Sequence, residues 1–177
     1  MIELFTERLK IRSISQSDWN YFNDLHQDKE VMKFITEVSP LSEIKAKFES
    51  RLLPWSFESG NWLTLVIEDV HTGCFVGLTG FHCDDNLLRR AEVGYIISPN
   101  AAGKGYGTES LKAVIDWGIH QFDIHKFIGI CATKNTASAK VMLNCGFMQE
   151  GCLRQNYKIG KHWVDEFVFG LLSNDIR

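Results

Sequence analysis

The residues with the clearest chemical meaning form a glycine-rich segment, Gly103-Lys104-Gly105-Tyr106-Gly107-Thr108. The apolar run before it, over 91–97, predicts a strand, and the apolar spacing after it predicts a helix over 108–122. Glycines let backbone N–H groups approach a ligand closely, and a helix N-terminus carries partial positive charge. The segment therefore indicates a site for phosphate or pyrophosphate, although a glycine turn that only starts a helix would have the same sequence.

Two familiar nucleotide loops do not fit this segment. A Walker A loop requires Gly-x-x-x-x-Gly-Lys followed by Ser or Thr, and none of these glycines is followed by Lys-Ser or Lys-Thr. A dinucleotide loop reads Gly-x-Gly-x-x-Gly within a parallel βαβ unit, whereas this one reads Gly-x-Gly-x-Gly after a mainly antiparallel start.

A second polar segment, Asn135-Thr136-Ala137-Ser138, lies between a strand predicted over 127–132 and a short helix predicted over 135–144. The Asn135 amide could cap that helix, or it could hydrogen-bond an extended ligand that crosses the sheet. Ser138, about one turn later, would face the same side as Asn135.

Together, in this order and spacing, the two segments resemble the cofactor motifs of the GNAT superfamily of N-acetyltransferases. The loop of that family has Gln or Arg where this chain has Ala102, a change that leaves the backbone N–H groups in place. Four further segments resemble the branch that acetylates ribosomal-protein N-termini: 6–12, 91–97, 146–151 and 160–165.

The resemblance implies acetyl-CoA as donor and co-substrate and a primary amine as acceptor, either a protein N-terminal α-amine or a small amine. It implies that two central strands splay at a β-bulge, leaving backbone groups free for the pantetheine arm, and that an N–H near Ile97 stabilises the oxyanion. The residues expected to bind the cofactor are Tyr95, Ile96, Ile97, Gly103, Lys104, Gly105, Tyr106, Gly107, Thr108, Asn135 and Ser138.

An acid is needed to return a proton to the departing thiolate. Many members of the family use a tyrosine in the helix after Asn135, but the matching position here is Met142, which cannot donate a proton. We therefore predict Ser138 as the acid, with Cys131 and Tyr157 as alternatives. Cys131 could equally be a buried core thiol.

A base is needed to take a proton from the acceptor ammonium, and Glu92 is the candidate, either directly or through water. Glu92 could instead be a strand carboxylate on a solvated face, and His82, one strand earlier, could share the proton. His120 and His125 are five residues apart, which is poor spacing for one helical face, so we expect no metal site.

The elements that must position these residues alternate in the order β-α-α-β-β-β-α-β-α-β-β. Four helices are expected, near 19–25, 41–52, 108–122 and 135–144. Seven strands are expected, near 9–12, 62–67, 74–81, 91–97, 127–132, 147–157 and 163–172. The order predicts an α+β fold, and the resemblance specifies a mixed, mostly antiparallel central sheet flanked by helices.

The composition sets the outer limits of the function. A chain of 177 residues suggests one domain, 1–177, and a net charge of −3 argues against nucleic acid as partner. Five cysteines without a Cys-x-x-Cys pair argue against a disulfide framework and for a reducing, cytoplasmic location. No apolar run has the length of a membrane span. The resemblance makes a homodimer plausible, and the alternative to an enzyme is a non-catalytic acyl-CoA-binding sensor.

Overall fold

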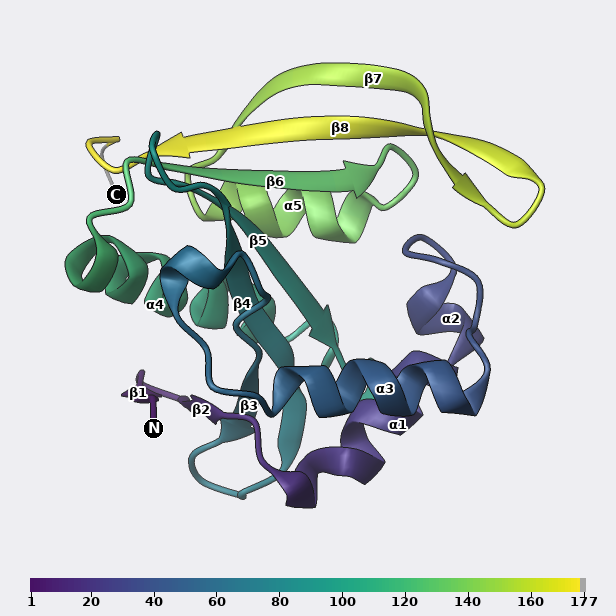
Figure 1. The fold of residues 1–177 in the computed structure, drawn as a ribbon, viewed down its shortest axis with the longest axis vertical. Helices are drawn as coiled ribbons and strands as arrows, with labels where there is room; N and C mark the ends of the chain where they lie inside the picture. Colours follow the sequence, from purple (N-terminus) through teal and green to yellow (C-terminus); the bar gives the residue numbers. More distant parts are fainter. Residues whose placement is uncertain (176–177) are drawn as a thin grey trace.

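A single mixed sheet of eight strands organises the computed structural model, which describes residues 1–175 (Figure 1). The strands are ordered β1-β2-β3-β4-β5-β6-β8-β7. Their bounds are β1 Glu3–Phe5, β2 Leu9–Ser13, β3 Leu65–Asp69, β4 Phe75–Asp85, β5 Arg90–Ile97, β6 Lys126–Ala132, β7 Met148–Ile159 and β8 His162–Leu172. Every neighbouring pair is antiparallel except β5 and β6, so the predicted α+β, mostly antiparallel fold is confirmed.

Five α-helices flank the sheet, with bounds α1 Trp19–Gln27, α2 Lys29–Met32, α3 Leu41–Arg51, α4 Tyr106–Phe122 and α5 Thr136–Asn144. The prediction missed β1 and α2, which have only three and four residues and therefore almost no periodicity to detect. It also extended β3 back to Trp62, where the chain makes isolated backbone bonds, from Leu63 N to Phe81 O (2.8 Å) and from Ile14 N to Thr64 O (3.4 Å), but no regular strand. Among residues 1–175, no helix is both long and apolar enough to cross a membrane.

The helices cover the two faces of the sheet with separate apolar clusters. On one face, Phe22 of α1 and Ile44 and Phe48 of α3 pack with Leu78 of β4. On the other face, a larger cluster joins α4 and α5 to the sheet, as where Gly118 lies against Phe81 and Phe127. Burial of these apolar faces fixes which side of each central strand a side chain points to.

The sheet opens between β5 and β6. These strands pair in parallel only from Arg90–Glu92 to Lys126–Ile128, and then diverge (Figure 1). We expected a β-bulge at this point, but the three pairs are regular, and the nearest irregularity lies between β4 and β5, at Cys83 and Asp85. The strands separate where the Tyr95 side chain reaches across to α5. The splayed strand pair is present, without the bulge expected to cause it.

Candidate active site

A cavity of about 1020 Å³ lies at the opening between β5 and β6. It brings together the predicted cofactor loop, the Asn135–Ser138 segment and the predicted catalytic residues Glu92, Ser138 and Cys131. Two predicted residues do not line the cavity, Lys104 and His82. The Lys104 carbonyl instead accepts a hydrogen bond from Arg8 Nη1 (3.0 Å).

Alternation along β5 divides the cavity into two sides. Tyr95 and Ile97 point to the face covered by α4 and α5, which also carries the glycine loop. Glu92 and Ile96 point to the face covered by α1 and α3. A ligand in the gap between β5 and β6 can therefore be approached from the α1–α3 side while it is held from the α4–α5 side.

The glycine loop has the backbone of an anion cradle. Gly103 (φ +77°) and Gly105 (φ +82°) are in the left-handed region, which favours glycine. The first intrahelical bond of α4 runs from Glu109 N to Gly105 O (3.1 Å), so the N–H groups of the first turn have no carbonyl within the helix. Those free donors and the dipole of a 17-residue helix suit the pyrophosphate that the sequence predicts here.

A brace from the N-terminal segment holds this loop in place. Arg8 Nε donates to Glu109 Oε2 (2.7 Å), Thr6 Oγ1 donates to Glu109 Oε1 (2.6 Å), and the Arg8 guanidinium lies 4.7 Å from the centre of the Tyr106 ring. Burial raises the pKa of Glu109, but the hydrogen bonds from Thr6 and Arg8 outweigh it and hold that pKa below its usual value. Sequence reasoning missed this brace, although the resemblance of segment 6–12 to the family pointed to those residues.

The end of β5 presents free backbone groups to the gap. Ser98 N donates to Val76 O (2.9 Å), and in an antiparallel pair the bonded positions alternate. Tyr95 and Ile97 are therefore at the non-bonded positions opposite β4, and their N–H and C=O groups face the gap. The same alternation turns the backbone groups of Ile96 toward β4, so Ile96 has only its side chain to offer the cavity.

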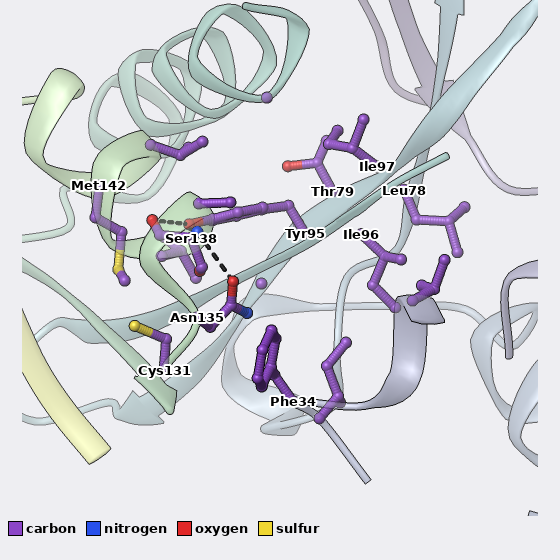
Figure 2. Close-up of a pocket in the computed structure, with 18 of the residues that line it drawn as sticks. Phe34, Leu78, Thr79, Tyr95, Ile96, Ile97, Cys131, Asn135, Ser138 and Met142 are labelled. Carbon is purple, nitrogen blue, oxygen red and sulfur yellow. Dashed lines mark hydrogen bonds between the residues drawn. The ribbon is translucent and has the colours of Figure 1, made fainter. Parts of the chain in front are cut away.

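Polar side chains from β5, β6 and α5 meet at the start of α5 (Figure 2). Tyr95 Oη lies 2.8 Å from both the carbonyl oxygen and the hydroxyl of Ser138, and Asn135 Oδ1 accepts from Ser138 N (3.2 Å), as a helix cap does. Burial raises the pKa of Tyr95 and of the Cys131 thiol, so both keep their protons at neutral pH. Met142 is buried, and its sulfur occupies the space beside Gly129.

The α1–α3 side of the cavity holds the candidate base. Glu92 Oε2 lies 3.5 Å from His82 Nε2, and the hydrogen bond to Glu92 raises the pKa of His82. Trp62 lies against His82, with ring centres 4.4 Å apart, and is packed so closely on Gly94 that a Cβ there would be 2.7 Å from the indole ring. Glu92 and His82 thus form a pair that could accept a proton beside an aromatic wall.

Thr79 is a buried polar residue of the cavity that was not predicted. It is 3% exposed, pairs with Tyr95 across β4 and β5, and points to the same side of the sheet (Figure 2). Its hydroxyl has no hydrogen-bond partner among residues 1–175. A buried hydroxyl without a partner is unfavourable, so this atom is a candidate ligand contact. In the sequence, the only signal at Thr79 is the preference of threonine for strands.

Within the described part of the chain, no group of three or more His, Cys, Asp or Glu side chains is arranged to hold a metal ion. Tyr157, the remaining candidate acid, reaches the cavity from β7 and is 41% exposed. The side chains and backbone groups of the cavity can offer hydrogen bonds to an anionic, extended ligand and can move protons.

Comparison with protein families and curated proteins gives a consistent match. The family described as "Acetyltransferase (GNAT) domain" matches residues 8–148. The chain is 25% identical over 174 residues to the uncharacterized N-acetyltransferase YnaD of Bacillus subtilis, covering 98% of this chain and 99% of that protein. It is also 31% identical over 80 residues to the ribosomal-protein-serine acetyltransferase of Escherichia coli, covering 45% of each.

Solved structures show the same fold. An acetyltransferase of the GNAT family from Bacillus anthracis superposes with a TM-score of 0.83 at 25% identity, covering 97% of this chain and 98% of the other. Spermidine N-acetyltransferase from Vibrio cholerae, in complex with CoA and spermine, superposes with a TM-score of 0.82 at 20% identity, covering 96% and 98%.

Proposed function

Because this chain belongs to the GNAT acetyltransferase family, we propose that it transfers the acetyl group of acetyl-CoA to a primary amine, which attacks the thioester directly. The observation that carries the proposal is the opening between β5 and β6 beside the glycine loop, since together they offer free backbone donors to an extended anionic ligand. Acetyl-CoA supplies the activated acetyl thioester. In this proposal residues 1–177 act as one catalytic domain.

Backbone groups do most of the binding in this proposal. The N–H groups at the start of α4 bind the pyrophosphate, and the gap-facing groups of Tyr95 and Ile97 bind the pantetheine arm. The N–H of Ile97 also faces the position where negative charge develops on the carbonyl oxygen, and such preorganised donors are a large part of acyl-transfer catalysis. Thr79 adds a hydroxyl donor on the same side of the sheet.

Proton transfer is divided between the two sides of the cavity. On the α1–α3 side, Glu92, paired with His82, takes a proton from the acceptor ammonium, directly or through water. On the α4–α5 side, Ser138 supplies the proton for the departing thiolate, and Tyr95 holds the serine hydroxyl in place. Cys131, next to Ser138, is the second donor.

The acceptor that we favour is a protein N-terminal α-amine, with a small amine as the other class. The resemblance of segments 6–12 and 91–97 to the branch that acetylates ribosomal-protein N-termini supports the first class. Names among the relatives include both a ribosomal-protein-serine acetyltransferase and a spermidine N-acetyltransferase.

A second function is favoured by one observation: the buried Met142 stands where many members of the family have a catalytic tyrosine. On that reading the chain binds acyl-CoA as a sensor and transfers nothing. Calorimetry with acetyl-CoA, followed by a thiol-release assay on peptides, polyamines and aminoglycosides, separates the two. Binding with thiol release supports the enzyme, binding without release from any amine supports the sensor, and absence of binding excludes both.

A further inference from the structure

Two cationic side chains of α3 line the acceptor side of the cavity. Lys47 and Arg51 are four residues apart, so they project from the same face of the helix, and both contribute to the cavity wall. Lys45, on the same helix, is exposed like Lys47 but does not line the cavity.

Neither cation has an anionic partner in the described chain. No carboxylate of residues 1–175 lies within 4 Å of Lys47 Nζ or of the Arg51 guanidinium, whereas Arg12 contacts both Asp18 and Glu68. Arg51 is half-buried, and burial lowers the pKa of its guanidinium, as expected for a cation without a counter-charge, whereas Lys47 lies exposed at the cavity wall. Two cations without a carboxylate partner can bind an anionic group of a ligand.

These cations lie on the side of the candidate base and not on the side of the phosphate loop. The Arg51 guanidinium lies 5.8 Å from the centre of the Trp62 ring, Trp62 contacts His82, and His82 contacts Glu92. The glycine loop and α4 belong to the opposite face of the sheet. An anion bound by Arg51 would therefore belong to the molecule that presents its amine to Glu92.

Of the three carboxylates of residues 1–175 that line the cavity, two face a lysine or a histidine, and the third accepts a hydrogen bond from a neutral amide. Glu30 bonds Lys33 (2.7 Å), Glu92 faces His82, and Glu166 accepts from Asn156 Nδ2 (2.8 Å). A polyamine would bring a second ammonium group that needs a carboxylate, and on this wall it would meet two cations instead. The α3 wall therefore disfavours the second ammonium group of a polyamine.

We infer that the acceptor is a primary amine that also carries a carboxylate, and that Arg51 and Lys47 bind this carboxylate while the amine faces Glu92. This inference rests on the proposed acetyl transfer and names its substrate class. Arg51 is suited to the task because its planar guanidinium can bind a carboxylate through two parallel hydrogen bonds. The carboxylate could come from an acidic side chain near a peptide N-terminus or from a free amino acid.

The test uses the full-length protein, acetyl-CoA and acceptors in matched pairs, with thiol release as the assay. One pair is two C-terminally amidated peptides that differ only by Glu or Gln next to the N-terminal residue. The other is a free amino acid and its amide. We expect kcat/KM to be about 10-fold or more higher for the carboxylate member of at least one pair, and the pair that responds identifies the source.

Variants then assign the effect to the two cations. Arg51→Gln and Lys47→Gln should each reduce the preference for the carboxylate acceptor, measured as the ratio of the two kcat/KM values within a pair, and should leave the KM for acetyl-CoA unchanged. Lys45→Gln is the matched control and should keep the full preference. Because the amide acceptor is assayed with the same protein sample, a variant that folds poorly is recognised by loss of both activities.

The outcomes separate this inference from the function it rests on. Thiol release that is equal for both members of both pairs, or faster with spermidine than with any carboxylate acceptor, overturns the inference and leaves the acetyl transfer standing. A carboxylate preference that survives in Arg51→Gln and Lys47→Gln also overturns it. Absence of thiol release with every acceptor overturns both.

Discussion

Replacement of Gly105 by alanine tests the assignment of the glycine loop most directly. Gly105 has φ +82°, and an L-residue in this left-handed region is less stable by roughly 1–2 kcal/mol. The added Cβ would also lie 3.4 Å from Arg8 Nη2, the guanidinium that holds the loop through the Lys104 carbonyl. If acetyl-CoA binding requires this loop conformation, the free energy of the strain is subtracted from the binding free energy. The acetyl-CoA Kd should then rise about 5- to 30-fold.

Two further alanine variants separate the contributions. Gly103 has nearly the same φ (+77°) but nothing within 4 Å of its Cβ position, so Gly103→Ala carries the strain alone. Gly60 also has positive φ (+67°), and its Cβ position is at an ordinary contact distance from Cys83 O (3.9 Å), at the opposite end of β4 and β5 from the loop. Gly60→Ala should lower the free energy of unfolding and leave the acetyl-CoA Kd unchanged.

Isothermal titration calorimetry gives the Kd, and urea unfolding gives the free energy of unfolding for each variant. We expect the acetyl-CoA Kd to rise in the order wild type, Gly103→Ala, Gly105→Ala. An unchanged Kd in both loop variants, with stability lowered as in Gly60→Ala, would refute the assignment of the pyrophosphate to this loop.

The remaining predictions concern proton transfer and the buried hydroxyl. Ser138→Ala should lower kcat more than it changes the acetyl-CoA Kd, as measured by thiol release and calorimetry; unchanged turnover would move the acid elsewhere. Protonated His82 engages the Glu92 carboxylate, so kcat should fall as the pH drops through the raised pKa of His82. In Glu92→Gln, the residual rate should fall at a lower pH than in the wild type, because His82 has lost the carboxylate that raises its pKa. A fall at the same pH in both proteins would exclude a role for the Glu92–His82 pair. Thr79→Val should maintain or raise the urea midpoint while weakening acetyl-CoA binding; unweakened binding would exclude Thr79 as a ligand contact.

Much of the architecture followed from local patterns. The long strands and helices have apolar residues at regular spacing, so β5, α4 and α5 were predicted within a few residues of their observed bounds. The start of α4 was placed two residues late, because the left-handed Gly105 caps a helix that begins at Tyr106. Helix α2 was missed because the Asp28 cap precedes only four helical residues.

The site was less accessible to sequence reasoning, because its parts meet through the tertiary fold. The glycine loop and the Asn135 cap are local features and could be read directly. The contact between Arg8 and Glu109 joins residues 101 positions apart, and the orphaned hydroxyl of Thr79 depends on how the sheet packs. In the sequence, Lys47 and Arg51 are ordinary polar positions of an amphipathic helix. Only the fold shows that they line the cavity that also holds Glu92.

The long separation of Arg8 and Glu109 has a consequence for the protein during its synthesis. Arg8 leaves the ribosome 101 residues ahead of Glu109, which corresponds to roughly 5–20 s of translation. Until α4 has emerged, Arg8 lacks its partner Glu109, so the brace that holds the glycine loop cannot form. On the proposed function, acetyl-CoA binds to a loop that is braced only after residues 8 and 109 have met, and its binding stabilises the folded state relative to the unfolded one.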